Sequence, residues 1–173
     1  MDCTGASTPG GSLFGWAYDY ALKQGLEMET SYPATAQPSR CHYKKTCVAV
    51  TFDSIRGANS TSPLKGNETA LAQALHTSPI TAVLAVGIDF ERYTHGILAS
   101  CGEQTMGNLA VEVVGYGVSA QGKAFWTVKA PWGEQFGDKG FVQIAKDAGN
   151  ACGIADTWAY PVGVKYTPAP ALC

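Results

Sequence analysis

Six cysteines and three histidines are the residues of this chain that could support nucleophilic or metal chemistry. A thiolate nucleophile needs a base beside it, and that base needs a third group that orients it. A zinc site needs cysteines and histidines at characteristic spacings. Cys41, His42 and Cys47 lie close together in the sequence, but their spacing does not fit a zinc site. The pattern therefore predicts no metal site and no other cofactor.

Seven short segments occur in an order that resembles the papain-like cysteine peptidases, in particular their cathepsin L-like members. These segments are Asp2-Cys3, Gly10-Gly11 and residues 30–33, 79–88, 132–141, 150–155 and 160–162. Each motif is short, but seven of them in the family's order form a specific signal. The resemblance extends from Asp2 to about Val162, which is nearly the whole chain.

Two further segments resemble the strands that carry this family's catalytic histidine and asparagine. Residues 108–117 resemble the strand that reads Asp-His and then an apolar run ending in Val-Gly-Tyr-Gly, and the histidine position falls on Leu109. Residues 128–133 resemble Lys-Asn-Ser-Trp-Gly, and the asparagine position falls on Ala130. Leucine cannot serve as a base and alanine cannot orient one. The resemblance therefore implies a degenerate, catalytically inactive peptidase homologue.

The front of the family's domain has no counterpart in this sequence, and neither does its Cys-x-x-Cys-Trp motif. That front carries the oxyanion-hole glutamine and the helix with the nucleophile, so both are expected to be missing. Gly10 and Gly11 resemble the loop whose backbone holds an extended peptide. A residual peptide groove that binds by β-augmentation is therefore an alternative to complete loss of function.

The remaining polar candidates are His95, Glu112 and Asp138, which could serve an enzyme of another type. Their spacing forms neither a dyad nor a triad, and His95 is interpreted as a solvated turn residue. Glu112 interrupts an apolar strand, where a lone buried carboxylate would be costly. An outward-facing position on a half-exposed strand is the simpler interpretation. A contact to a partner chain, or a buried pair with Arg or Lys, is the alternative.

Composition limits the function classes. A chain of 173 residues with 46% apolar content can form one ordinary core. The net charge of −2 provides no electrostatic footprint for nucleic acid. No apolar run reaches the length of a membrane span, and the first residues lack the features of a signal peptide.

The cysteine content suggests an oxidising compartment, which would be extracellular or the lumen of the secretory or endolysosomal system. Six cysteines allow fifteen pairings. The resemblance implies the pairs Cys3–Cys41 and Cys101–Cys152. Cys47 and Cys173 are extra to the family pattern, and they could pair with each other or with a partner chain. Asn59 and Asn67 each begin a glycosylation sequon in a polar, loop-like stretch.

Periodicity predicts the elements that position these residues. Apolar residues at helical spacing predict a helix between a cap at Ser12 and an end at Gly25, and Asn67 can cap a second helix through His76. Residues 26–47 are typical of a loop. Strands are predicted over 48–55, 80–88, 109–116, 124–129 and 140–145.

These elements predict an α+β fold, namely a papain-like cysteine proteinase fold that lacks the N-terminal nucleophile helix. Residues 1–162 would form the partial domain, and residues 163–173 a C-terminal tail. Within the domain, residues 1–47 would be the remainder of the helical half. Residues 48–162 would be an antiparallel barrel-like half with helices at its side.

The first predicted helix carries an aromatic stripe formed by Phe14, Trp16 and Tyr20. In the family this helix packs near the nucleophile helix, so the stripe would be uncovered without that segment. Large exposed apolar patches mark interfaces. We therefore expect a separate N-terminal segment or another protein to cover the stripe. The leading functional hypothesis is an inactive homologue that acts as a structural or accessory subunit. The alternative is a peptide-binding decoy or peptidase-inhibitor module.

Overall fold

The computed structural model describes most of the chain. The described residues are Cys3, 14–33, 40–59, 61–103, 107–168, Pro170 and Cys173, with Phe14 described in its backbone only. The expectations for Gly10, Gly11 and the Ser12 cap lie outside these ranges. Within them, no helix combines the length and the apolar character that crossing a bilayer requires.

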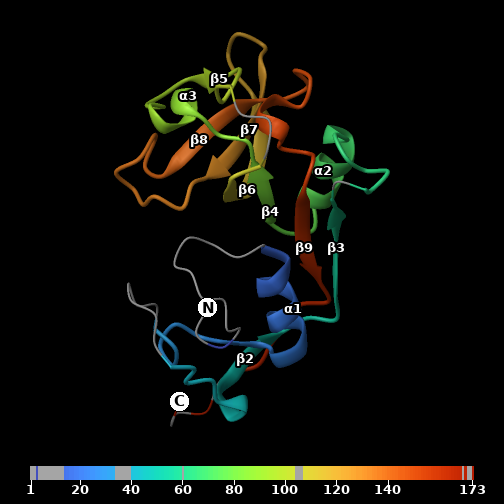
Figure 1. The fold of residues 1–173 in the computed structure, drawn as a ribbon, viewed down its shortest axis with the longest axis vertical. Helices are drawn as coiled ribbons and strands as arrows, with labels where there is room; N and C mark the ends of the chain where they lie inside the picture. The colour runs from blue at the N-terminus through green and yellow to red at the C-terminus, as the bar shows by residue number, and fades with distance from the viewer. Residues whose placement is uncertain are drawn as a thin grey trace. The chain divides into compact units, whose positions relative to one another are not determined.

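The chain forms two compact units, and each is described by itself. Unit 1 comprises residues 1–55 and 161–173, and unit 2 comprises residues 56–160. The chain passes from one unit to the other within β3 (Ser54–Ala58) and again within β9 (Trp158–Val162) (Figure 1). The structure thus divides the chain near residues 55 and 160, whereas the sequence analysis placed divisions after residues 47 and 162.

Unit 1 contains α1 (Phe14–Gln24), whose end agrees with the prediction from sequence. Gly25 follows with a φ of +75°, and its amide donates to the Ala21 carbonyl at 2.8 Å. A left-handed residue after the last turn is the usual way to end a helix, and glycine adopts it without steric cost. Gly25 therefore ends α1 as expected.

A small antiparallel sheet completes unit 1. Its central strand β2 (Val48–Thr51) lies between β1 (Leu26–Glu27) and β10 (Lys165–Tyr166). A short 3-10 helix, η1 (Lys45–Cys47), precedes β2. The segment predicted as a loop thus contains a strand and a helical turn. The segment predicted as a tail is integrated into the sheet, because β10 pairs with β2 and the Thr167 amide donates to the Ala49 carbonyl.

Unit 2 is built on a seven-stranded sheet in the order β3-β9-β4-β6-β7-β8-β5. The strands not yet given are β4 (Ile80–Leu84), β5 (Ile97–Leu98), β6 (Leu109–Val118), β7 (Ala124–Lys129) and β8 (Phe141–Ala145). The strands from β4 to β8 pair antiparallel, whereas β5 adds to β8 in parallel. No pairing among the described residues joins β3 to β5, so the predicted barrel-like half is a mixed, open sheet rather than a closed barrel.

The core of unit 2 comes mainly from alternate residues of these strands and from α2 (Glu68–Leu75), with further side chains from the segments between them. The largest fully buried side chains include Leu71, Ile80, Leu84, Phe90, Val113, Trp126, Val128, Val142, Ile144 and Ile154. Burying each such side chain contributes about 1.5–3 kcal/mol. Asn67 caps α2 as predicted, because its side-chain carbonyl accepts the Ala70 amide at 2.9 Å.

Two predicted strands were too long. The run over 48–55 breaks at Phe52 and Asp53, and its end belongs to β3. The run over 80–88 leaves the sheet after Leu84 and enters the short helix α3 (Ile88–Glu91). The amides of Ala85 and Gly87 bond to the carbonyls of Cys152 and Cys101 rather than to a neighbouring strand. Apolar content alone does not reveal that change of partner.

Three disulfides account for all six cysteines. Cys3–Cys41 and Cys101–Cys152 are the two pairs that the family resemblance implied, and both are present in the structure. Cys47 pairs with Cys173 across 126 residues, which resolves the choice that the sequence left open. This bond ties the end of the chain to the start of β2. In the chain-entropy estimate, closing such long loops contributes roughly 3–5 kcal/mol each.

Candidate functional site

The two positions that the sequence resemblance assigns to the base and its orienter, Leu109 and Ala130, lie at one end of the β6–β7 pair. Leu109 is the first residue of β6 and faces Leu84 across the β4–β6 ladder. Ala130 follows directly after β7, is 4% exposed, and donates its amide to the Gly140 carbonyl at 2.9 Å. The antiparallel register of β6 and β7 brings these positions to the same end of the pair. Neither side chain has an atom that could accept, donate or orient a proton.

Asn108 fixes the start of β6 at this position. Its side-chain carbonyl accepts the Val86 amide at 2.9 Å, and its side-chain amide donates to the Val86 carbonyl at 2.8 Å. Its backbone amide donates to the Leu84 carbonyl. The Asn108 side-chain amide therefore exchanges two hydrogen bonds with the backbone of Val86, as a peptide group of a neighbouring strand would. No local signal in the sequence predicts this role, because the bonding partner of Asn108 is 22 residues away.

Trp132, two residues after Ala130, belongs to an aromatic cluster. Its ring lies edge-on to Phe136, with centroids 4.6 Å apart, and edge-on to Phe90 at 5.6 Å. Phe90 is fully buried, whereas Trp132 remains 43% exposed. Edge-on aromatic pairs contribute about 0.5–1.5 kcal/mol beyond their buried area. The cluster accounts for Trp132 through packing and leaves one side of its indole open to solvent.

Glu112 is half-buried on β6, between Thr81 of β4 and Lys129 of β7 in the sheet register. The register therefore places a cation-bearing residue opposite it. The two ion pairs found in the described part of the chain are Lys146–Asp147 and Lys165–Asp53, so Glu112 takes part in neither. This position fits the half-exposed strand residue expected from sequence better than a buried ion pair.

The other polar candidates are dispersed. His95 is exposed, and its Nδ1 lies 2.9 Å from the Thr94 hydroxyl, while Asp138 is an exposed turn residue. Cys41 and Cys47 are in different disulfides, which leaves no thiolate for a metal beside His42. In the described ranges, no group of three or more metal-ligating side chains is arranged to hold an ion.

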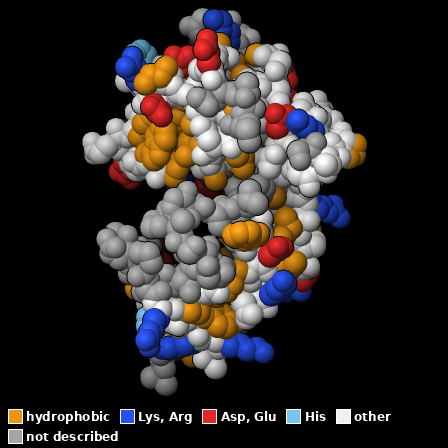
Figure 2. All heavy atoms as spheres, viewed as in Figure 1, with side chains coloured by type: hydrophobic (Ala, Val, Ile, Leu, Met, Phe, Trp, Pro, Cys, Tyr) orange, Lys and Arg blue, Asp and Glu red, His pale blue; other side chains and the backbone are white. Residues whose placement is uncertain are grey.

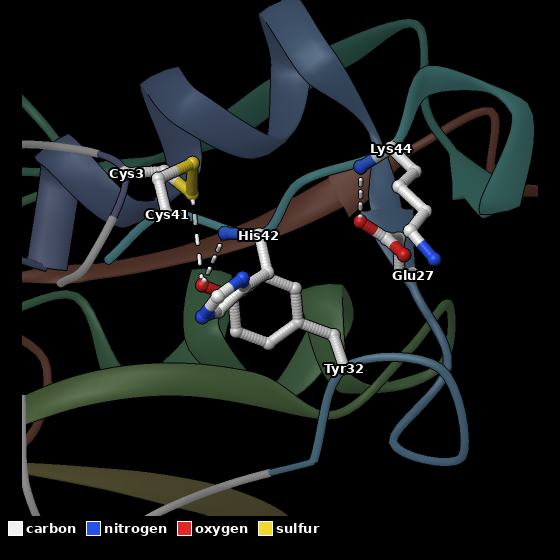
Figure 3. The surroundings of a disulfide bond; sticks show 6 residues. All are labelled: Cys3, Glu27, Tyr32, Cys41, His42 and Lys44. Carbon is white, nitrogen blue, oxygen red and sulfur yellow. Dashed lines mark hydrogen bonds between the residues drawn. A yellow bond between two sulfur atoms is a disulfide. The ribbon is translucent and has the colours of Figure 1, made fainter. Parts of the chain in front are cut away.

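The surroundings of Cys3–Cys41 form a second polar cluster, within unit 1 (Figure 3). The Tyr32 hydroxyl accepts the His42 backbone amide at 3.4 Å and lies 3.8 Å from the Cys3 sulfur. Beside it, one carboxylate oxygen of Glu27 accepts the Lys44 amide at 2.8 Å. Tyr32 belongs to one of the family-like motifs, and here its role is to hold the disulfide loop in place.

One residue of the aromatic stripe on α1, Trp16, is described as exposed. Figure 2 shows apolar side chains reaching the surface at several places on one face of the molecule. On α1, Trp16 is 53% and Leu22 40% exposed, whereas Ala21 is buried. Tyr20 is half-buried because its ring lies edge-on to Tyr43, with centroids 6.2 Å apart.

Part of the predicted aromatic stripe is therefore already used within unit 1. Burial raises the pKa of the Tyr20 hydroxyl above its ordinary value, and Tyr43, Tyr32 and Glu27 raise it further. Of the three residues proposed for the interface, Trp16 is the one with a described, exposed side chain.

Glu68, for which the sequence carries no local signal, joins α2 to β7 and to the loop that contains Asp147 and Asn150. One carboxylate oxygen accepts the Trp126 indole N–H at 3.0 Å and the Asp147 amide at 2.9 Å. The other accepts the Asn150 amide at 2.9 Å. Asp147 and Asn150 have positive φ values of 57° and 60°, which direct their amides into the turn. This carboxylate therefore accepts the backbone amides of the loop that leads to Cys152 and holds that loop in place.

The open, mostly antiparallel sheet, the disulfide-bonded loops and the position of residues 108–133 together define a papain-like fold. A sequence profile described as papain family cysteine protease matches residues 1–162. The chain belongs to this family.

Named relatives agree with the assignment. Over 182 residues, the chain is 35% identical to cysteine proteinase EP-B 1 of Hordeum vulgare, covering 98% of this chain and 47% of that protein. It is 33% identical to digestive cysteine proteinase 2 of Homarus americanus, covering 94% of this chain and 50% of that protein. The chain thus spans about half the length of the curated relatives that it matches.

Solved structures extend the agreement to the fold. The bromelain protease from Ananas comosus, solved with the E64 inhibitor, superposes with a TM-score of 0.80 at 27% identity, covering 94% of this chain and 74% of that chain. Digestive procathepsin L2 proteinase from Tenebrio molitor larval midgut superposes with a TM-score of 0.81 at 28% identity, covering 93% and 50%. The predicted fold class is therefore confirmed.

Proposed function

We propose that this chain belongs to a catalytically inactive papain-family homologue that acts as a structural or accessory subunit of a protein assembly. The observation that carries the proposal is the pair Leu109 and Ala130 at the positions of the base and its orienter. Cysteine peptidase chemistry requires both groups, because the thiol must lose its proton to an oriented base. Apolar side chains at both positions remove that step.

The state of the cysteines supports the same proposal. All six are bonded in disulfides, so this part of the protein supplies no thiol of its own. A disulfide sulfur is neither a nucleophile nor a metal ligand until it is reduced. Three disulfides also favour an oxidising compartment. We place the protein outside the cell, or in the lumen of the secretory or endolysosomal system.

The accessory role rests on α1. Trp16 and Leu22 of this helix are exposed, and Ala21 is the one buried residue among its described side chains. The helix therefore contributes little to the core of its own unit. An amphipathic or apolar helix is stabilised mainly by packing against a partner. We infer that α1 packs against a further segment of the full protein or against another protein, because exposed apolar side chains such as Trp16 and Leu22 are typical of an interface.

The competing proposal is a peptide-binding decoy or peptidase-inhibitor module, for which the exposed indole of Trp132 is the supporting observation. Native purification distinguishes the two. An accessory subunit is expected to co-purify with a partner at fixed stoichiometry, with a native mass above that of the full-length chain. A decoy is expected to be monomeric and to bind peptides with measurable affinity. A monomer that binds neither peptide nor protein would contradict both.

A further inference from the structure

The connection between β3 and α2 carries two glycosylation sequons, which differ in structure. Figure 1 shows this connection beside α2, away from strands β6, β7 and β8 of the same unit. Its described residues form successive turns, with the Ser62 amide bonded to the Asn59 carbonyl and the Lys65 amide to the Ser62 carbonyl. Nearly all of them, including Asn59 and Asn67, are exposed. A glycan therefore requires no rearrangement of the core here.

Asn59 and Thr61, the two defining residues of the first sequon, are already brought together. The Asn59 side-chain carbonyl accepts the Thr61 hydroxyl at 2.9 Å and the Thr61 amide at 3.1 Å. This is an Asx turn, in which the side chain replaces a backbone acceptor. The described contacts of this side chain are made by its oxygen. The side-chain nitrogen, which is the atom that receives the sugar, takes part in none of them.

Asn67 begins the second sequon but has a structural task. Its side-chain carbonyl caps α2 by accepting the Ala70 amide, and its backbone carbonyl accepts the Leu71 amide. The next residue, Glu68, accepts three hydrogen bonds, one from β7 and two from the loop at Asp147 and Asn150. In the described contacts, the Asn67 side-chain carbonyl thus holds the start of α2 rather than the hydroxyl of its own sequon, Thr69. At Asn59, by contrast, the carbonyl binds the amide and the hydroxyl of Thr61 within the exposed turn.

We propose that Asn59 is an N-linked glycan acceptor and that it is preferred over Asn67. The donor is an oligosaccharide held on a lipid pyrophosphate. The Asn59 side-chain nitrogen forms a bond to the anomeric carbon of the first sugar, and the bond from that carbon to the pyrophosphate oxygen breaks. The lipid pyrophosphate leaves with the electron pair, and the amide gives up one proton to a base of the transferase. The sequon supplies the acceptor amide and the hydroxyl that the transferase recognises.

The test uses the full-length protein secreted from eukaryotic cells. Peptide mapping before and after peptide-N-glycosidase treatment in heavy-oxygen water marks each released site as a labelled aspartate. We expect the label at residue 59. Asn59→Gln and Thr61→Ala are expected to abolish it, whereas Thr61→Ser and Asn67→Gln are expected to retain it. Thr61→Ser is the matched control, because it keeps the hydroxyl.

Translation of the same variants into microsomes tests glycosylation even where a variant fails to fold. In this assay, sugar transfer is detected as an increase in the apparent mass of the newly made chain. A band shift that Asn59→Gln removes and Asn67→Gln retains supports the proposal. An unmodified residue 59 in secreted protein, or no shift in microsomes, would overturn it. So would a higher occupancy at residue 67 than at residue 59.

Discussion

Replacing Glu68 with alanine is expected to lower the free energy of unfolding by about 3 kcal/mol, because a single carboxylate accepts three hydrogen bonds. The largest part of this loss comes from Trp126. Its indole is fully buried, and its N–H would be left without an acceptor. The loop at Asp147 and Asn150 would also lose the anion that holds its left-handed residues in place.

Urea denaturation of the full-length protein with its disulfides intact measures this effect. Glu68→Gln is the informative companion, since one amide oxygen can replace only one of the two carboxylate oxygens, and we expect an intermediate loss. Glu134→Ala serves as the control because Glu134 is exposed, and substitutions at such surface positions usually change stability by less than about 0.5 kcal/mol. Equal stability of Glu68→Ala and Glu134→Ala would show that the carboxylate does not join these segments.

Replacing Trp16 with aspartate is expected to weaken assembly by on the order of 100-fold. Burying an aromatic side chain at an interface contributes about 1.5–3 kcal/mol, and each 1.4 kcal/mol corresponds to a tenfold change in affinity. An aspartate would in addition carry an unpaired charge into the interface. Because Trp16 is 53% exposed, the substitution should leave unit 1 folded.

Tyr166→Asp is the matched control for this experiment, because Tyr166 is an aromatic residue of the same unit and is 62% exposed. Native mass measurement of both variants separates an effect on assembly from a general effect of charge. Retention of the native complex by Trp16→Asp would place the interface elsewhere. Loss of the complex in both variants would argue against a role specific to α1.

Local signals in the sequence predicted the elements with strong caps or periodicity. Gly25 and Asn67 mark helix boundaries through backbone chemistry that acts within four residues, so the sequence reveals them. The residues of β4, a central strand of unit 2, alternate between buried and half-buried, and this period is equally local. The family resemblance supplied the fold and two of the three disulfides.

Other features depend on partners far away in the chain. The Cys47–Cys173 bond spans 126 residues, and cysteine counting cannot select it from the possible pairings. The strands β1, β5 and β10 have two residues each, which is too short for a periodic signal. Glu68 meets Trp126, Asp147 and Asn150 at separations of 58 to 82 residues. Only the folded chain brings these groups together.

Hydrolysis of fluorogenic peptides by the purified full-length protein tests the loss of catalysis most directly. An active papain-family relative, assayed in parallel with a thiol-directed covalent inhibitor, provides the positive control. Leucine at residue 109 and alanine at residue 130 predict no turnover above the blank and no cysteine labelled by the inhibitor. Hydrolysis that the inhibitor abolishes would contradict the account, because it would require a base and a thiolate that these positions cannot support.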